Sequence, residues 1–580
     1  MCAAESVMSD PSGHGMALRA ADGLSGEPEP GKVVTARPHG LIEGLRNAYY
    51  ASAVYPLTLT GPAPTGLAVT PEDPWPGDPV LADALFQGRY RFAGHEVTAP
   101  SRPIWLPLGA SEAWIEEMHG FEWLRNLKAN GGEAARRQAR GLIMDWCREF
   151  GAWRPIVWRA DILGRRLAAW LVNASFLLRG AEQDFTGGYY DSLARQARHL
   201  TRAAGREVVG GRRLSAIRGL LFAALCLDWG ERRRVQLLRL LVHEIAAQVL
   251  SDGGHIERSP SVLRRALGDL AELRGLLVAA KQTPPEELIQ ALDRLAPMLR
   301  ALRHGDGGLA CFNDSFEDDP ALIDVTLTIA DARGKALANA PHAGFQRLQA
   351  RRTLVLVDAG PPSALAEHVQ AGTLSFEMSV AKERLIVNCG PHWGRGPEWA
   401  TALRSTGAHS TLTVDDTNST EFVHRGLGRR PRTVTCTRME QDGTIWIDLG
   451  HDGYAANFGL IHRRRLYLNA DGDDLRGEDS LEGAPDSKTR DRWPQPFAVR
   501  FHLHPSVQAS LVRNGQAVLM RLPSGIGWQF RASGGSIAVH PSIYFGADGE
   551  RRRSEQVVVS GMAPPDGAQV KWALRRVSRR

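Results

Sequence analysis

The stretch EHVQAGTLSFEMSVAKERLIVNCG, from Glu367 to Gly390, decides how the second half of this chain is interpreted. It predicts two β-strands joined by a short charged turn. His368 and Gln370 stand one residue apart at its front, so in a strand both side chains would leave on the same face. A His-x-polar spacing at the entry of a buried strand can hold a base and a ligand side by side.

Strand patterns continue from this stretch to the end of the chain, for example in STLTVDD, TIWIDLG and EQVVVSG. Asp442-Gly443 and Asn514-Gly515 lie between alternating runs, which predicts tight hairpins. No segment of helical period interrupts these strands. We therefore expect them to pair antiparallel in a large β-sandwich.

The residues before this region, from His39 onward, have helical periodicity instead. FEWLRNLKANGG, from Phe121 to Gly132, is an amphipathic helix with a glycine stop. It belongs to a series of about eight helices joined by loops that contain Gly, Pro or Asp. Short loops make neighbouring helices antiparallel, which allows a bundle, a solenoid or a closed (α/α) toroid.

The acidic, turn-rich stretch HGDGGLACFNDSFEDDP, from His304 to Pro320, predicts a junction between two domains. We therefore expect a helical domain over residues 38–315 and an antiparallel β-sandwich over residues 316–580. Residues 1–37 are rich in Gly, Pro, Ser and Ala and lack the apolar core of a secretory signal. They are expected to be a disordered tail, and the plain expectation is a cytoplasmic chain.

Composition narrows the classes of partner. The net charge is +6, and the arginine clusters are short, scattered and not interleaved with aromatic residues. This pattern does not favour nucleic-acid binding, whereas arginine side chains in a groove would suit an anionic polysaccharide. No run reaches the roughly 18 apolar residues of a membrane span. The six cysteines form no CxxC pair, and Cys226 and Cys389 are expected to be buried thiols.

Several blocks of this chain, in this order, resemble those of the heparinase II/III family of polysaccharide lyases. The blocks are FEWLRNL, DGGHIERSPS, HGDGGLACFND, GTLSFEMSVAKERLIVNCG, AHSTLTVDDTNS, HDGY and RFHLHPSV. The resemblance implies an (α/α) toroid followed by an antiparallel β-sandwich. It also implies β-elimination on a uronate polymer, which needs a base, a group that neutralises the uronate carboxylate, and an acid.

The family's catalytic histidine falls on His368, which this chain retains. The family's Asn-His pair falls near Gly211-Arg212, and its tyrosine falls on Val262, so these positions do not match. The resemblance also implies a zinc site, whose ligands fall on the residues Gln370, Asn388 and His409. Two of these three are amides, which are poor zinc ligands, so we expect no metal and no other cofactor. The three side chains could form a hydrogen-bonded polar cluster instead.

Arg212 is a candidate for neutralising a carboxylate, since a guanidinium binds one through two hydrogen bonds. The alternative interpretation is that Arg212 is a solvated residue in the first turn of a helix. His255, Glu257 and Arg258 precede the helix start at Ser259-Pro260 and could line the cleft where the family's tyrosine would stand.

His368 could transfer a proton or merely form a hydrogen bond to a neighbouring loop. Gln370 and His409 are candidates for contacts to substrate as well as for the polar cluster. Tyr454, in the HDGY block, could replace the missing acid, although a packed tyrosine in a turn is the simpler interpretation.

Two hypotheses follow from these observations. The first is a lyase that cleaves an anionic, uronate-containing polysaccharide, with His368 at its centre and Arg212, His255 and Glu257 as replacement groups. The second is a catalytically degenerate relative that binds a glycan or an envelope partner through the same cleft without turnover. Lyases of this family usually work in the periplasm or cell envelope, which is the alternative to a cytoplasmic location.

Overall fold

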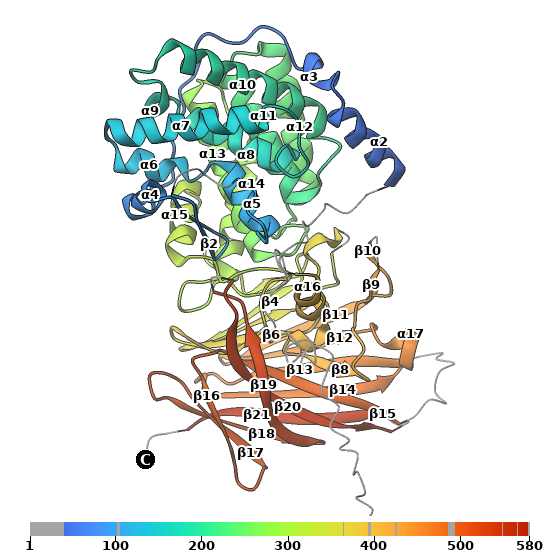
Figure 1. The fold of residues 1–580 in the computed structure, drawn as a ribbon. Coiled ribbons are helices and arrows are strands. Elements are labelled where there is room, and N and C mark those ends of the chain that lie inside the picture. Colours follow the sequence, from blue (N-terminus) through green and yellow to red (C-terminus); the bar gives the residue numbers. More distant parts are fainter. Residues whose placement is uncertain are drawn as a thin grey trace, which may run out of the picture.

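The computed structural model describes residues 40–100, 105–363, 365–392, 396–423, 426–484, 494–547, 549–564 and 567–577. The tail expected over residues 1–37 lies outside these ranges. In Figure 1 a helical domain stands above a β-sandwich, and the chain passes once from the first to the second. The predicted order of a helical half followed by a β half is confirmed.

The helical domain is built from helices of widely different length, with one short hairpin of β1 (Arg89–Phe92) and β2 (His95–Thr98) between them. The helices are α2 (Gly40–Ala51), α3 (Tyr55–Thr58), α4 (Pro79–Phe86), α5 (Glu112–Gly120), α6 (Leu124–Asn130), α7 (Gly132–Phe150), α8 (Ala160–Val172), α9 (Ala174–Leu178), α10 (Gln183–Ala203), α11 (Gly210–Cys226), α12 (Glu231–Gln248), α13 (Pro260–Ala279), α14 (Glu286–Ala301) and α15 (Pro320–Ala330).

Helices α8 and α11 lie at the centre of this domain. Every residue of α8 is buried, and so are most residues of α11. The two helices cross where Gly164 meets Gly219, and a Cβ atom on Gly219 would lie 2.3 Å from the Cα atom of Gly164. Only glycine allows this approach of the two backbones, so this pair fixes how the central helices pack.

The sandwich consists of two antiparallel sheets among the described residues. The first has the strand order β11-β12-β13-β14-β21-β18-β17-β16, and the second has the order β19-β20-β15-β7-β6-β5-β4-β3, with β8 also pairing β15. The strands of the first sheet are β11 (Val434–Gln441), β12 (Thr444–His451), β13 (Leu460–Leu468), β14 (Asp474–Gly483), β16 (Gln508–Val512), β17 (Ala517–Arg521), β18 (Gly527–Ser533) and β21 (Ala568–Val577). Those of the second are β3 (Asn339–Ala340), β4 (Phe345–Ala350), β5 (Thr353–Asp358), β6 (Phe376–Val380), β7 (Glu383–Val387), β8 (Leu412–Val414), β15 (Gln495–Leu503), β19 (Ser536–Tyr544) and β20 (Arg552–Ala563).

The smaller elements of this half are the strand pair β9 (Phe422–Val423) and β10 (Gly426–Leu427), and the helices α16 (Pro397–Arg404) and α17 (Ala455–Phe458). The predicted antiparallel pairing is confirmed. The Asp442-Gly443 hairpin is confirmed too, because both residues have positive φ and join β11 directly to β12.

The stretch from Glu367 to Gly390 departs from its prediction at the front. His368 ends a 3₁₀ helix of residues Ala366–His368, and β6 begins only at Phe376. His368 and Gln370 therefore do not share a strand face. The extended run is interrupted because Leu374 has a φ of 64° and the N–H of Ser375 donates to the carbonyl of Gly372, which closes a turn.

Helix α15 extends the helical domain further than expected. It begins at Pro320, with Asp319 as its N-cap, and packs against α13. The boundary expected between residues 315 and 316 falls ahead of this helix. Among the described residues, no helix has the length and apolar character needed to cross a bilayer.

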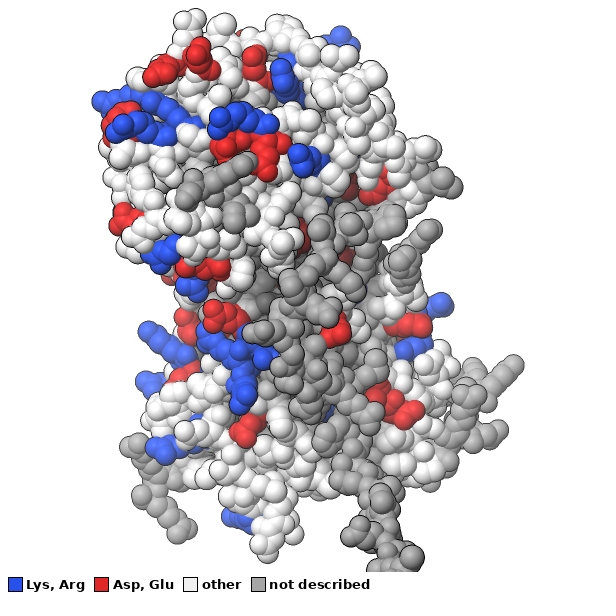
Figure 2. Space-filling model, viewed as in Figure 1, with Lys and Arg blue, Asp and Glu red and all other residues white. Residues whose placement is uncertain are grey.

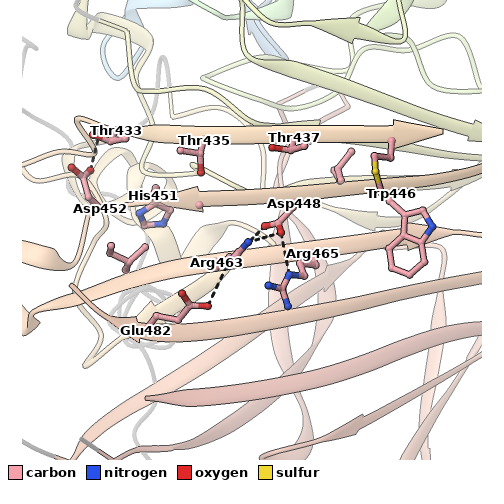
Figure 3. Close-up of a pocket in the computed structure, with 14 residues that line it drawn as sticks. Thr433, Thr435, Thr437, Trp446, Asp448, His451, Asp452, Arg463, Arg465 and Glu482 are labelled. Carbon is pink, nitrogen blue, oxygen red and sulfur yellow. Dashed lines mark hydrogen bonds and ion pairs between the residues drawn. The ribbon is translucent and has the colours of Figure 1, made fainter. Parts of the chain in front are cut away.

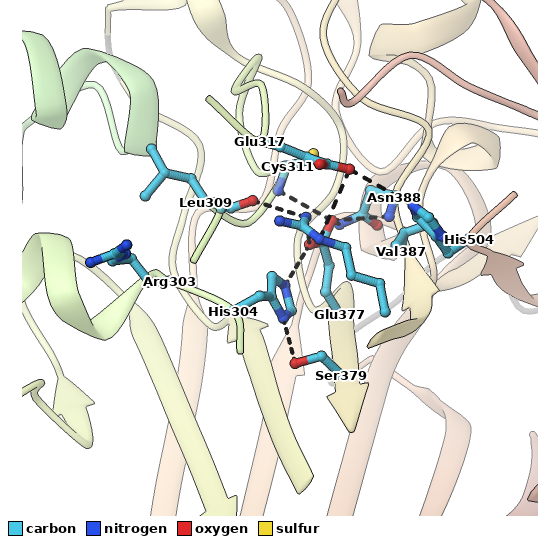
Figure 4. A network of polar contacts seen from close by, with 12 residues as sticks. Arg303, His304, Leu309, Cys311, Glu317, Glu377, Ser379, Val387, Asn388 and His504 are labelled. Atoms are coloured by element: carbon cyan, nitrogen blue, oxygen red, sulfur yellow. Dashed lines mark hydrogen bonds and ion pairs between the residues drawn. The ribbon is translucent and has the colours of Figure 1, made fainter. Parts of the chain in front are cut away.

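A buried polar network joins the end of the helical domain to β6 and β7 (Figure 4). Glu377 on β6 accepts hydrogen bonds from His304 Nε2 at 2.9 Å and from the N–H of Cys311 at 3.2 Å. Arg384 on β7 donates to Asp306 at 2.7 Å. Glu377 and Arg384 are almost fully buried, so each charge depends on these partners.

We expect Glu377→Ala to lower the free energy of unfolding by about 3–5 kcal/mol, because it leaves the buried donors of His304, Cys311 and Asn388 without their acceptor. Chemical denaturation followed by circular dichroism measures this loss. Asp471→Ala is the control, since Asp471 lies on the surface and its change should stay within about 0.5 kcal/mol. Equal effects of the two substitutions would contradict the role given to Glu377.

Candidate functional site

His368 lies where the helical domain meets the sandwich. Its Nδ1 atom donates a hydrogen bond to Asp314 Oδ2 at 2.9 Å. Its Nε2 atom lies 3.5 Å from Glu257 Oε2. The imidazole is thus held between a carboxylate of the domain junction and a carboxylate of the loop that precedes α13.

Asp314 is the centre of this arrangement. Its side chain is fully buried and accepts from the backbone N–H of His392 at 2.6 Å, while its own N–H donates to Gln370 Oε1 at 3.1 Å. Burial alone would raise the pKa of Asp314, but the charges and hydrogen bonds of His392 and His368 hold it well below its usual range. Asp314 and His392 are not among the predicted site residues, although Asp314 stands in the HGDGGLACFND block.

Val262 stands where the family's tyrosine falls, and Gly211 belongs to the position of the family's Asn-His pair. The two residues lie next to each other, beside His368. The N–H of Gly211, in the first turn of α11, donates to Glu257 Oε1 at 2.7 Å. A Cβ atom on Gly211 would lie 2.7 Å from Val262 Cγ1. The expected positions are therefore neighbours, but a glycine and a valine occupy them, and the Glu257 carboxylate fills the space between Gly211 and His368.

His255 belongs to the same loop but faces inward. Its Nδ1 atom accepts the N–H of Glu257 at 3.2 Å, and its Nε2 atom donates to Gln248 Oε1 at 3.1 Å. Burial lowers the pKa of His255, with only partial compensation from Glu257. It is a neutral imidazole that shapes the loop.

Arg212 is engaged with acidic side chains. Its guanidinium lies 2.6 Å from Glu367 Oε1, 3.1 Å from Glu116 Oε1 and 3.6 Å from Asp161 Oδ2. Arg159 forms ion pairs with Glu116 and Asp161 as well. Arg212 is therefore neither a solvated residue nor a cation held ready for a substrate carboxylate.

Arg258 is committed to the protein interior. Its guanidinium donates to the carbonyls of Ala343, Gly344 and Pro361, at 2.7, 3.1 and 2.7 Å, and pairs with Asp358. Nothing in this geometry presents Arg258 to a substrate. The adjacent Ser259-Pro260 helix start is as predicted, but the Ser259 hydroxyl pairs with Ser315 at 2.9 Å instead of capping the helix.

Gln370, Asn388 and His409 occupy the zinc-ligand positions and are all buried. Gln370 Oε1 accepts from the N–H of Asp314, and its Nε2 atom donates to the carbonyl of Gly390 at 3.0 Å. Asn388 accepts from the N–H of Ser410 at 2.9 Å and donates to Glu377 at 3.1 Å.

His409 Nδ1 donates to the carbonyl of Ser405 at 2.7 Å, and its Nε2 atom lies 3.2 Å from Gln370 Oε1. Burial lowers the pKa of His409 to about 4. Both amide side chains and the imidazole are thus committed to protein groups. This donor set does not fit a zinc ion, and the three residues act as a polar cluster that positions the loop around Asp314.

Tyr454 does not reach this region. It is fully buried in the core of the sandwich, and its hydroxyl donates to the carbonyl of Leu412 at 2.8 Å. Burial raises its pKa well above the usual value. The simpler interpretation, a packed tyrosine in a turn, agrees with this position.

The partners of His368 decide its protonation. Burial by itself would lower its pKa, but the hydrogen bond to Asp314 and the nearby charge of Glu257 outweigh that effect and raise the pKa to about 9. At neutral pH His368 is therefore an imidazolium. In this state it can donate a proton, but it cannot remove one.

The comparisons with known proteins agree with this architecture. Residues 332–573 match the family model described as heparinase II/III-like, C-terminal. The FtsZ-localized protein C of Caulobacter vibrioides is 35% identical over 562 residues, which covers 94% of this chain and 96% of that protein.

Two solved structures share the fold at low sequence identity. A crystal structure of heparinase III matches with a TM-score of 0.71 and 15% identity, over 93% of this chain and 92% of that one. A mutant of the heparan sulfate lyase HepC from Pedobacter heparinus matches with a TM-score of 0.59 and 17% identity, over 93% and 92% of the two chains. The predicted helical toroid followed by a β-sandwich is confirmed.

We expect the ion pairs of His368 to stabilise the protein below about pH 6.5, the ordinary histidine value, and to be lost as pH rises to about 9. The sign follows because the folded-state pKa lies above the unfolded one. His368→Gln should remove this contribution, on the order of 2–3 kcal/mol, and flatten the stability profile between these pH values. Denaturation of both proteins across this range measures the difference.

His342→Gln serves as the matched control, because His342 is exposed. Its profile should follow that of the unsubstituted protein. If the stability of His368→Gln depended on pH in the same way as that of the unsubstituted protein, the paired imidazolium would be ruled out.

Proposed function

The chain belongs to the heparinase II/III-like family, and from that premise we propose that it is a member that binds a partner without cleaving polysaccharide. The observation that carries this proposal is the pairing of His368 with Asp314 and Glu257. β-Elimination needs a base beside the uronate carbon, and a histidine protonated at neutral pH does not supply one.

The charge around His368 supports the same proposal. A uronate carboxylate has to be neutralised while its neighbouring carbon loses a proton. The carboxylates in the ion pairs of His368, Arg159 and Arg212 are Glu112, Glu116, Asp161, Glu257, Asp314 and Glu367. Among the described residues these six carboxylates outnumber the three cations that they pair with, the two guanidinium groups and the His368 imidazolium, so a further carboxylate would meet repulsion.

The nature of the partner is proposed from the relative. The protein from Caulobacter vibrioides is named for its localisation with FtsZ, and this chain aligns with it over nearly its whole length. We therefore propose that this chain also associates with FtsZ-containing assemblies. On this proposal the lyase fold is kept as a scaffold. The six carboxylates around His368, Arg159 and Arg212 occupy the region that corresponds to the family's active site.

A second candidate is a lyase acting on an anionic, uronate-containing polysaccharide. The retained His368 and the convergence of Gly211, Val262 and Glu257 on it favour this function. As an imidazolium, His368 would serve as the acid that protonates the leaving glycosidic oxygen. The Glu257 carboxylate, 3.5 Å from His368 Nε2, would then act as the base.

We expect no turnover of uronate polymers. The purified protein is incubated with heparan sulfate, hyaluronan, chondroitin and alginate, and ultraviolet absorbance reports any unsaturated product. A known polysaccharide lyase on the same panel is the positive control. Product formation that disappears in His368→Ala would overturn the binding proposal in favour of the lyase.

We also expect a fluorescent fusion of the full chain to localise with FtsZ in dividing cells. His368→Ala should localise in the same way, because association does not require proton transfer. A fusion that stays dispersed while FtsZ is assembled would exclude this partner. That outcome is separate from the result of the polymer assay.

A further inference from the structure

A groove lies on the outer face of the first sheet, across strands β11, β12, β13 and β14 (Figure 3). Its volume is about 710 Å³, within the usual range of small-molecule sites. No residue that lines it belongs to the His368 cluster. Binding in this groove is therefore independent of the chemistry at His368.

The register of the strands builds this groove in rows. Thr437, Asp448 and Arg465 lie side by side on β11, β12 and β13. In the next row Thr435 and Arg463 flank Gly450, where a Cβ atom would lie only 3.1 Å from Thr435 Oγ1. The missing side chain of Gly450 makes the floor of the groove, and hydroxyl and charged side chains form its walls.

The charged groups inside the groove compensate one another. Asp448 accepts from Arg463 Nε and Nη2 at 2.8 and 2.7 Å, and from Arg465 Nε at 3.1 Å. Arg465 also donates to Glu478 at 2.8 Å. These side chains are only partly buried, so the ion pairs hold them in place while they face solvent. On the face of the molecule that Figure 2 shows, acidic and basic side chains are also interspersed.

An aromatic surface stands at one end of the groove. Trp446 is 48% exposed, and its ring centroid lies 4.5 Å from that of Tyr467 on the neighbouring strand. Tyr467 in turn lies beneath the guanidinium of Arg476. This tilted ring contact holds the Trp446 indole on the sheet and leaves much of it open to a ligand.

We propose that this groove binds a neutral oligosaccharide. The apolar face of a sugar ring packs on the Trp446 indole, and neighbouring hydroxyls of the next ring exchange hydrogen bonds with Thr435, Thr437 and the Asp448–Arg463 pair. Planar carboxylate and guanidinium groups offer paired acceptors and donors at the spacing of adjacent hydroxyls.

The charge of the groove selects against other ligands. Because its arginines are already paired with Asp448 and Glu478, a polyanion gains no free cation there. An extended peptide would be expected to pair with the backbone edge of β11, an edge strand of this sheet, whereas the groove is lined by side chains on the sheet face. A ligand rich in hydroxyls and without net charge fits best.

The test is calorimetric titration of the full chain with neutral hexasaccharides of glucose, mannose and N-acetylglucosamine. We expect at least one to bind and Trp446→Ala to weaken that binding at least about tenfold, while Trp446→Phe retains most of it. Asp448→Asn should also weaken binding. Leu511→Ala is the control, because Leu511 is equally exposed on β16, at the far end of the same sheet.

Thermal unfolding of each variant shows that the sheet is intact. Failure of every neutral hexasaccharide to bind, or binding that Trp446→Ala leaves unchanged, would overturn the proposal. Uronate hexasaccharides and a library of extended peptides are titrated in parallel. If only one of these binds, and Trp446→Ala abolishes that binding, the groove takes another class of ligand and the proposal fails.

Discussion

The guanidinium of Arg258 is the interaction on which the geometry between the two domains depends. Arg258 extends from the loop between α12 and α13 into the sandwich. Its guanidinium donates to backbone carbonyls just before β4 and just after β5, and it lies over the ring of Phe345. A buried arginine is tolerated because each donor finds an acceptor and Asp358 balances the charge. With Arg258 fixed, Glu257 is brought to both Gly211 and His368.

Two histidines in this region show how partners can reverse the effect of burial on a pKa. His255 and His368 are both enclosed, yet the pKa of the first is lowered and that of the second is raised to about 9. His255 forms hydrogen bonds with a backbone N–H and an amide oxygen and has the Glu257 carboxylate 4.0 Å away, whereas His368 forms a hydrogen bond to one carboxylate and lies 3.5 Å from a second. The same side chain is therefore a neutral structural group in one place and a cation in the other.

The amides at Gln370 and Asn388 hold the loops around this cluster. An amide donates and accepts at once, so Gln370 joins two backbone groups, and Asn388 joins a backbone N–H to the Glu377 carboxylate. The charged and polar groups around His368 are thus paired with one another. The partly exposed ion pairs and the open indole lie instead on the outer face of the first sheet, where a ligand can reach them.

The sequence by itself determined the helical half, the antiparallel sandwich, the Asp442-Gly443 hairpin and the family, because periodicity and turn residues act over short distances. It also named Glu257, which lies beside His368, but not Asp314. Only the tertiary structure decided their chemistry. Asp314 and Glu367 lie far apart in sequence from their partners His392 and Arg212, and Leu374 interrupts a strand that its neighbours predict. Ion pairing and burial depend on contacts between distant segments, which no local pattern encodes.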